Sequence, residues 1–217
     1  MLILLTIVTG AVDAFSYLAL GHTLVANMTG NVVFLGFALG GAGGFIWWAS
    51  ALAIVTFCGG ALLGGRVALM KGGHRAVHLC AGAITETVLV AGALVVSLVS
   101  HAPYDGWSLA VLVALLGVAM GVQNATARAL AVPDLTTTVL TLTITAIAAD
   151  PGGGKSGKIG RRLVPIVGMF LGGLVGALLV TQGHGSWDLG VVLVLLVAVV
   201  ALSRAASSSR EAWTNKR

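Results

Sequence analysis

Six stretches of this sequence are apolar over a length that crosses a lipid bilayer, and no soluble fold accommodates them all. A helical span takes about 20 predominantly apolar residues. The six stretches lie near 2–20, 45–69, 77–99, 109–130, 163–182 and 188–203. Only 9% of the 217 residues are charged, whereas a soluble domain has roughly 25%. The sequence therefore predicts an all-α integral membrane protein with six transmembrane helices.

Two further apolar segments, 27–41 and 133–149, are shorter. As helices they would be about 22–25 Å long, against a hydrocarbon core of about 30 Å. If neither segment crosses, all twelve Lys and Arg residues fall on one side of the membrane; if both cross, four fall opposite the other eight. Because Lys and Arg are enriched in cytoplasmic loops, we expect two short re-entrant helices and both termini in the cytoplasm.

The chain also contains an internal repeat. Gly10 matches Gly121 and Asp13 matches Asn124, both at an offset of 111 residues. Further along, the tripeptide 27–29 matches 134–136. A repeat in so apolar a chain is typical of membrane proteins whose two halves meet around a shared site.

Each repeat holds three membrane-crossing spans and one short segment that does not cross. Because three is an odd number, the second repeat starts on the opposite side of the membrane from the first and must be inverted relative to it. The predicted organisation is a first repeat at 1–107, an inverted second repeat at 108–203 and a basic cytoplasmic tail at 204–217. The glycine pairs Gly60/Gly64 and Gly172/Gly176 occupy related places in the two repeats. They predict close helix contacts, either within the chain or in a homo-oligomer.

Both short segments open with polar residues, which are our candidate solute-binding residues. They are Asn27, Thr29 and Asn31 in the first segment and Asp134, Thr136, Thr137 and Thr138 in the second. If both helix starts lie near the midplane, their free N–H groups and positive dipole ends favour a neutral polar or anionic solute. The alternative is that these residues only cap two helices and bond to their neighbours.

Two carboxylates, Asp13 and Glu86, lie near the middle of predicted spans. A charge in the bilayer is costly, and such residues are commonly functional. We therefore hypothesise that Asp13 or Glu86 couples solute movement to protons or another ion. The alternative is a structural hydrogen bond, such as one between Asp13 and Asn124.

The sequence contains no pattern typical of an enzyme, a cofactor site or a nucleic-acid site. No nucleophile stands with a base inside the spans, and the three outer-loop histidines, His22, His101 and His184, lie on separate segments. The stretch 149–156 fits a relaxed phosphate-loop pattern, but it lacks the strand-to-helix context that such a loop needs. We expect no cofactor, no metal and no nucleic acid; the expected partners are the lipid bilayer and a small solute.

Three stretches carry a resemblance to a known family. They are VTGAVDAFSY at 8–17, VANMTGNVVFLG at 25–36 and PDLTTTVLTLT at 133–143. With these motifs, the chain resembles the YoaK-like family over almost its whole length. The resemblance implies a multi-spanning protein of the bacterial cytoplasmic membrane, and it implies no substrate, reaction or site residue.

Together, these observations favour a small-solute channel or secondary transporter with a midplane site between the two repeats. The alternative is a non-transporting membrane protein that binds or assembles a partner and whose polar motifs are structural. A cavity between 27–31 and 134–138 would favour transport, and a tightly packed apolar centre would favour the alternative.

Overall fold

The computed structural model describes residues 1–70, 75–130, 141, 144–145 and 157–207, and these contain helices and no strand. The helices are α1 (Leu2–Ala19), α2 (Met28–Leu39), α3 (Trp47–Met70), α4 (Arg75–Ser100), α5 (Gly106–Leu130), α7 (Gly157–Thr181) and α8 (Gly185–Ser207). Within these described ranges, six helices are long and apolar enough to cross a membrane, and α2 is a shorter apolar helix. The predicted all-α class and the six long apolar helices are confirmed.

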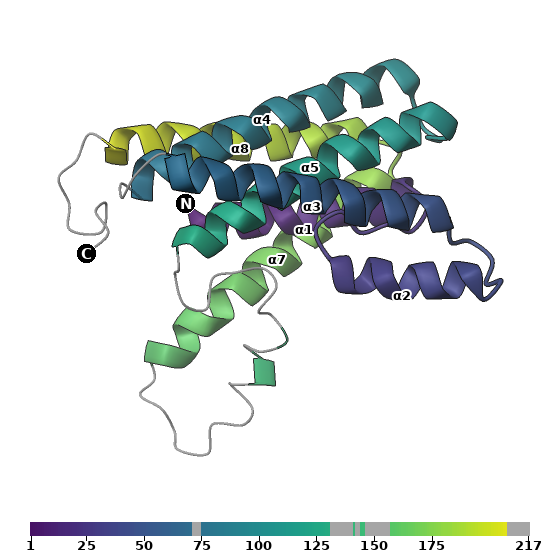
Figure 1. Cartoon of the computed structure of the whole chain (residues 1–217), viewed down its shortest axis with the longest axis horizontal. Coiled ribbons are helices and arrows are strands. Elements are labelled where there is room, and N and C mark those ends of the chain that lie inside the picture. Colours follow the sequence, from purple (N-terminus) through teal and green to yellow (C-terminus); the bar gives the residue numbers. More distant parts are fainter. Residues whose placement is uncertain (71–74, 131–140, 142–143, 146–156, 208–217) are drawn as a thin grey trace.

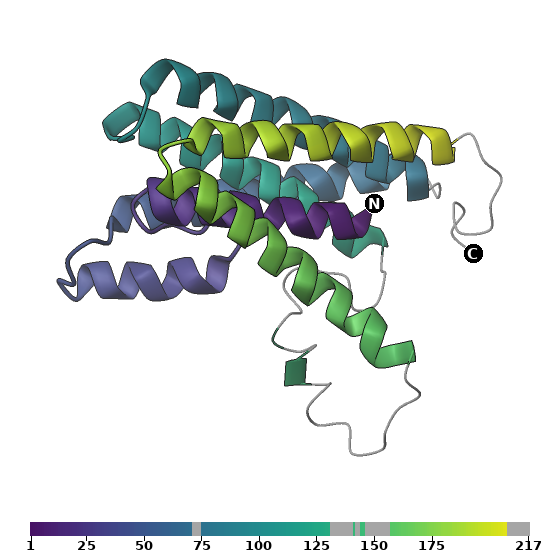
Figure 2. The ribbon, with the colours of Figure 1, turned by 180° about the vertical axis from the view of Figure 1, so that it is seen from behind.

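The helices form a bundle whose centre lies between α1, α4, α5 and α8 (Figure 1). α4 packs against both α5 and α8, and α1 packs against α8. α3 lies along α5 on one flank, α7 lies along α1 on the other, and α2 packs mainly on α3. Seen from behind, α7 diverges from the rest of the bundle toward its N-terminal end (Figure 2). Each flanking helix thus packs on the first helix of the other predicted repeat.

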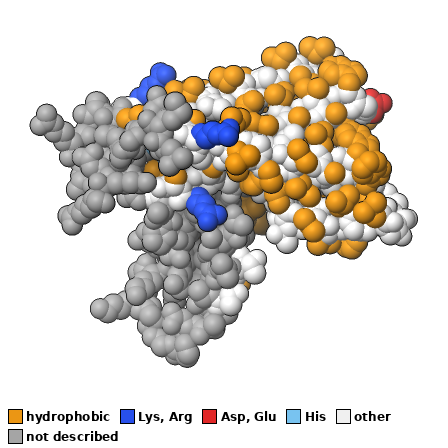
Figure 3. Space-filling model, in the orientation of Figure 1, with side chains coloured by type: hydrophobic (Ala, Val, Ile, Leu, Met, Phe, Trp, Pro, Cys, Tyr) orange, Lys and Arg blue, Asp and Glu red, His pale blue; other side chains and the backbone are white. Residues whose placement is uncertain are grey.

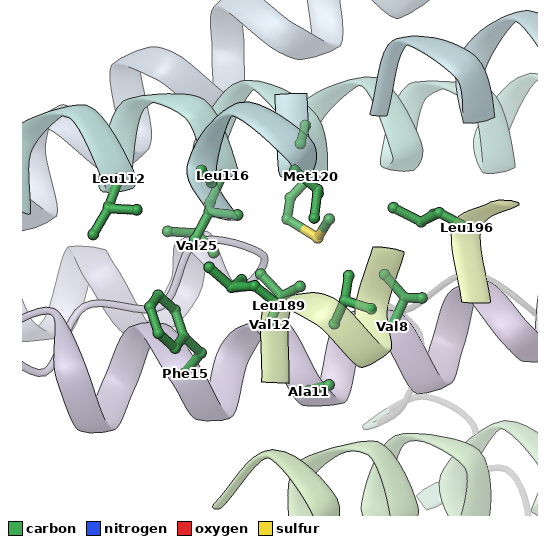
Figure 4. Close-up of a cluster of buried hydrophobic side chains, with 14 of the residues drawn as sticks. Val8, Ala11, Val12, Phe15, Val25, Leu112, Leu116, Met120, Leu189 and Leu196 are labelled. Atoms are coloured by element: carbon green, nitrogen blue, oxygen red, sulfur yellow. The ribbon is translucent and has the colours of Figure 1, made fainter. Parts of the chain in front are cut away.

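The core between the four central helices is formed by side chains spaced three and four residues apart. On α8 the buried residues at this spacing are Leu189, Val192, Leu196, Val199 and Ser203, and on α4 they are Ala76, Leu79, Ala83, Glu86, Val90, Ala93 and Ser97. This is the seam of helices that pack nearly antiparallel. Val8, Val12 and Phe15 of α1 and Leu112, Leu116 and Met120 of α5 complete the cluster (Figure 4).

Glycines bring α1 against α7 at backbone distance. A Cβ on Gly10 would overlap Met169 O and lie 2.8 Å from Gly173 N, and one on Gly172 would overlap Ile7 O. Contacts advance together along both helices, from Ile3 opposite Gly168 to Ile7 opposite Gly172, so the two helices run in the same direction.

The same contact recurs between α3 and α5. A Cβ on Gly121 would overlap Phe57 O and lie 2.8 Å from Ala61 N, and one on Gly60 would overlap Val118 O. Gly121 and Val118 stand 111 residues after Gly10 and Ile7, so the two halves of the chain make the same interhelical contact. The predicted close packing at Gly60 and Gly172 is therefore found, and it lies inside the chain.

Large apolar side chains are exposed along the long helices, and on the face seen in Figure 3 they spread over the bundle while the described Arg side chains lie toward one end. Arg66, Arg128 and Arg204 are exposed near the ends of α3, α5 and α8. Exposed tryptophans lie at the starts of the same helices, at Trp47, Trp107 and Trp187. The long apolar surface between a basic end and an aromatic end is the distribution expected of a membrane protein.

Candidate functional site

The first short helix starts partway along the bundle axis, and not at the end of α1. After α1 ends at Ala19, the chain turns through Gly21 and His22, both with positive φ, and returns along α1. Ala26 N then donates a hydrogen bond to Asp13 Oδ1 at 2.9 Å. Asp13 lies six residues before the end of α1, which corresponds to about 9 Å at 1.5 Å per residue. Met28, the first residue of α2, therefore begins near the level of Asp13 rather than at the end of α1.

The irregular segment before α2 is held by buried polar side chains. Leu24 N donates to Asn31 Oδ1 at 2.9 Å, and Asn31 Nδ2 donates back to Leu24 O. Val25 N donates to Ser16 Oγ at 3.4 Å. Backbone groups in a membrane interior need such internal partners. Asn31 therefore supports the entry into α2, as the alternative interpretation of this residue expects.

The other two candidate residues of this segment lie at the surface of the described structure. Asn27 is the N-cap of α2, and its Oδ1 accepts from Gly30 N at 3.4 Å. Asn27 and Thr29 are both exposed, so the free N–H groups of the first turn are not enclosed by the described helices. This leaves the helix start open to a solute or to the second short segment.

The second half of the predicted solute site falls outside the described residues. This applies to Asp134, Thr136, Thr137 and Thr138 and to the start of the segment 133–149. Their approach to Asn27 remains a prediction.

The two predicted carboxylates have different surroundings. Asp13 is 7% exposed and accepts the backbone hydrogen bond from Ala26. Glu86 is 1% exposed, and its Oε1 is buried without a hydrogen-bond partner in the described part of the chain. Asn124, the repeat match of Asp13, donates to Met120 O within its own helix at 2.9 Å. Asp13 thus anchors a chain segment, whereas Glu86 lacks an evident structural role.

Sequence reasoning missed a polar group on α5. Gln123 Nε2 donates to Thr9 Oγ1 at 2.7 Å and to Leu5 O at 3.3 Å, joining α5 to α1. Gln123 Oε1 and Thr126 Oγ1 are buried, and neither has a partner among the residues described. The signal was present, because Gln123 is a polar residue deep inside a predicted span, beside the matched Asn124.

Asp188 was also missed. It lies in the first turn of α8 with no exposed surface, and its two carboxylate oxygens have no hydrogen-bond partner within the described ranges. Its Oδ1 lies 3.0 Å from the position that a Cβ on Gly176 would take. Gly176 therefore makes room for a third buried carboxylate, at the opposite end of α8 from Arg204.

The outer histidine His22 belongs to an aromatic cluster. Its ring packs on Tyr17 and Phe45, with centroids 5.0 and 5.6 Å away, and its Nδ1 lies 2.8 Å from Gly44 O. The part of the chain that the structure describes holds no group of three or more His, Cys, Asp or Glu residues arranged to bind a metal ion. His22 is therefore accounted for by packing.

Comparison with known proteins gives two matches. The family model described as "Protein of unknown function (DUF1275)" matches residues 1–202. The UPF0700 transmembrane protein YoaK of Bacillus subtilis (strain 168) is 30% identical over 154 residues, which are 70% of this chain and 67% of that protein. No solved structure matches. The two matches agree with the resemblance drawn from the sequence motifs.

Proposed function

We propose that this chain, which belongs to the DUF1275 family of proteins of unknown function, is a membrane channel or secondary transporter for a small polar or anionic solute. The chain is a multi-pass membrane protein. The observation that carries the proposal is the position of the start of α2, beside Asp13 and inside the end of α1. A short helix that starts at depth presents free N–H groups to a solute, as the broken helices of transporters do.

The inverted-repeat arrangement is part of this proposal. It is supported by the recurrence of one glycine contact, Gly10 with Gly172 in α1·α7 and Gly121 with Gly60 in α3·α5. An inverted second repeat would bring its own short segment from the opposite face, toward Asn27. The solute would then lie between the two helix starts, with Asn27, Thr29, Asp134 and the threonines at 136–138 around it.

A non-transporting assembly protein is the second candidate. It is favoured by the dense apolar packing at the centre of the bundle, where Val12, Leu116 and Met120 are fully buried. It is also favoured by the purely structural bonds of Asn31. In that case the polar motifs would serve only to build α2 into the fold.

Solute movement is tested in proteoliposomes containing the purified chain, with uptake and efflux of a metabolite mixture resolved by mass spectrometry. We expect polar or anionic metabolites to move relative to protein-free liposomes. Asn27→Ala should reduce their flux, because it removes both the cap and the amide. Asn27→Ser keeps a capping oxygen, so wild-type flux in this variant would limit Asn27 to capping. Failure of any solute to move would favour the assembly protein.

We also propose that the protein lies in the bacterial cytoplasmic membrane with its basic end inside. Single cysteines replacing the exposed residues Ala102 and Gln182 should react in intact cells with a membrane-impermeant thiol reagent. A cysteine at Ala205, near Arg204, should react only after the cells are opened. The native Cys58 and Cys80 are replaced by alanine beforehand, because Cys58 is exposed. If the cysteine at Ala205 reacted in intact cells, the basic end would face the outside and the proposed orientation would be wrong.

A further inference from the structure

Glu86 lies in the seam of α4 that faces the centre of the bundle. It is 1% exposed, and within the described structure its Oε1 has no hydrogen-bond partner. The next seam positions on either side, Ala83 and Val90, are apolar and buried. An ionised carboxylate without a partner is very costly in such surroundings, whereas a protonated carboxyl costs much less.

Contacts between α4 and α5 locate Glu86 relative to α5. A Cβ on Gly82 would overlap Thr126 Oγ1, and one on Gly92 would lie 3.6 Å from Leu115 Cδ1. The two helices therefore run antiparallel, and Glu86, between Gly82 and Gly92, is at the level of about residue 122 of α5. Gln123 lies at this level, and Thr126 lies one helical turn away.

The direction of helical side chains brings Glu86 and Thr126 toward each other. Side chains on a helix lean toward its N-terminus. On antiparallel helices, Glu86 therefore leans toward the level of Thr126 and Thr126 leans toward the level of Glu86, while Gln123 already begins at the level of Glu86. Gly82 makes room for the Thr126 side chain one turn below Glu86.

The orientation of the Gln123 amide is fixed by its partners. Thr9 Oγ1 donates its hydrogen to Leu5 O at 2.9 Å, so toward Gln123 it can only accept. Leu5 O is also an acceptor, so the amide nitrogen must face α1. Gln123 Oε1 is therefore an acceptor left in the core without a donor among the described groups.

We propose that Glu86 binds a proton in the core of the bundle, with Gln123 Oε1 accepting the hydrogen bond from the protonated carboxyl. The proton adds to one carboxylate oxygen and gives a neutral acid. The Thr126 hydroxyl then donates to the other oxygen. Binding of one proton thereby gives hydrogen-bond partners to Glu86, Gln123 and Thr126 together. Unlike a metal ion, the proton needs no cavity of its own.

The helices that pack on α4 place no other charge at this level of the described bundle. The helices packed on α4 carry charged residues only near their ends or beyond this level: Arg66 of α3, Arg128 of α5, and Asp188 and Arg204 of α8. On α4 itself, His78 is buried two turns toward the N-terminus. The proton is therefore the counter-charge that this carboxylate requires.

The same geometry connects the proton to the candidate solute site. Gln123 binds Thr9, and Asp13, one turn further along α1, holds Ala26 at the start of α2. Loss of the proton would place a carboxylate beside Gln123 Oε1 and disturb the Gln123–Thr9 bond. This step rests on the proposed transport function, and it makes Gln123 the positioning residue between a coupling proton and a solute.

Infrared spectroscopy of the purified protein in nanodiscs tests the proton site. The spectrum of wild type minus that of Glu86→Gln should contain the C=O band of a protonated carboxyl. Gln123→Leu should shift this band to higher wavenumber, because the carboxyl loses its acceptor. The matched control is Thr87→Val, because the Thr87 hydroxyl bonds to Ala83 O of its own helix at 2.6 Å. Thr87→Val should leave the band in place.

Carboxylate bands in place of the C=O band, or a C=O band that Gln123→Leu leaves unmoved, would overturn the proton site. Flux measurements test the connection separately. Glu86→Gln should remove the dependence of solute flux on a pH gradient while the protein remains folded. If wild type moves no solute, the proposed function fails, and the infrared spectra still decide whether Glu86 holds a proton.

Discussion

Gly60→Ala is expected to lower the free energy of unfolding by about 1–3 kcal/mol, the usual cost of overpacking a close contact. The added methyl group would overlap Val118 O of α5 and lie 2.8 Å from Val118 C. Backbone atoms cannot rotate away as a side chain does, so α3 and α5 must separate. Thermal unfolding of the detergent-purified protein, followed by circular dichroism, measures the effect.

The neighbouring glycine provides the matched control. A Cβ on Gly59 meets nothing within 4 Å among the described residues, and alanine is the better helix former by about 1 kcal/mol. Gly59→Ala should therefore unfold at the same temperature as wild type or higher. Equal destabilisation by the two substitutions would mean that α3 does not pack on α5 in this register.

The glycine pair Gly172 and Gly173 in the second half of the chain allows the same test. Here the first glycine of the pair makes the close contact, and the second does not. Gly172→Ala would overlap Ile7 O, whereas a Cβ on Gly173 lies 3.7 Å from Gly10 O, an ordinary contact. Gly172→Ala should destabilise and Gly173→Ala should not. If only one of the two glycine pairs showed this difference in stability, the contact would not be repeated in both halves. The two-repeat proposal would then lose its support.

The long helices could be predicted from the sequence because their signal is local. A run of apolar residues long enough to cross a bilayer is informative whatever it packs against, as in Leu163–Thr181. The packing partners could not be predicted in the same way. Gly60 and Gly172 indicate close approach, but only the folded chain shows that each faces the first helix of the other half.

The candidate site was predicted in part. The polar start of the segment after Asn27 and the buried carboxylates Asp13 and Glu86 follow from residue type and position. Their partners do not, because the bond from Ala26 to Asp13 depends on a chain reversal at Gly21 and His22. The role of Gln123 depends on the packing of α5 near α1. Asp188 was overlooked because the start of a predicted span is where charges are ordinarily tolerated.

The last prediction separates anchoring by Asp13 from ion coupling by Asp13. Asp13→Asn keeps an oxygen that can accept from Ala26 N, so we expect nearly wild-type stability. Asp13→Leu leaves that N–H without its partner, which costs about 1–3 kcal/mol, and should increase hydrogen exchange in the segment 20–31. If Asp13 only anchors, Asp13→Asn retains pH-dependent flux, whereas a coupling carboxylate would lose it. Because the structure already gives Asp13 a backbone partner and gives Glu86 Oε1 none in the described chain, we expect pH dependence to survive in Asp13→Asn and to disappear in Glu86→Gln.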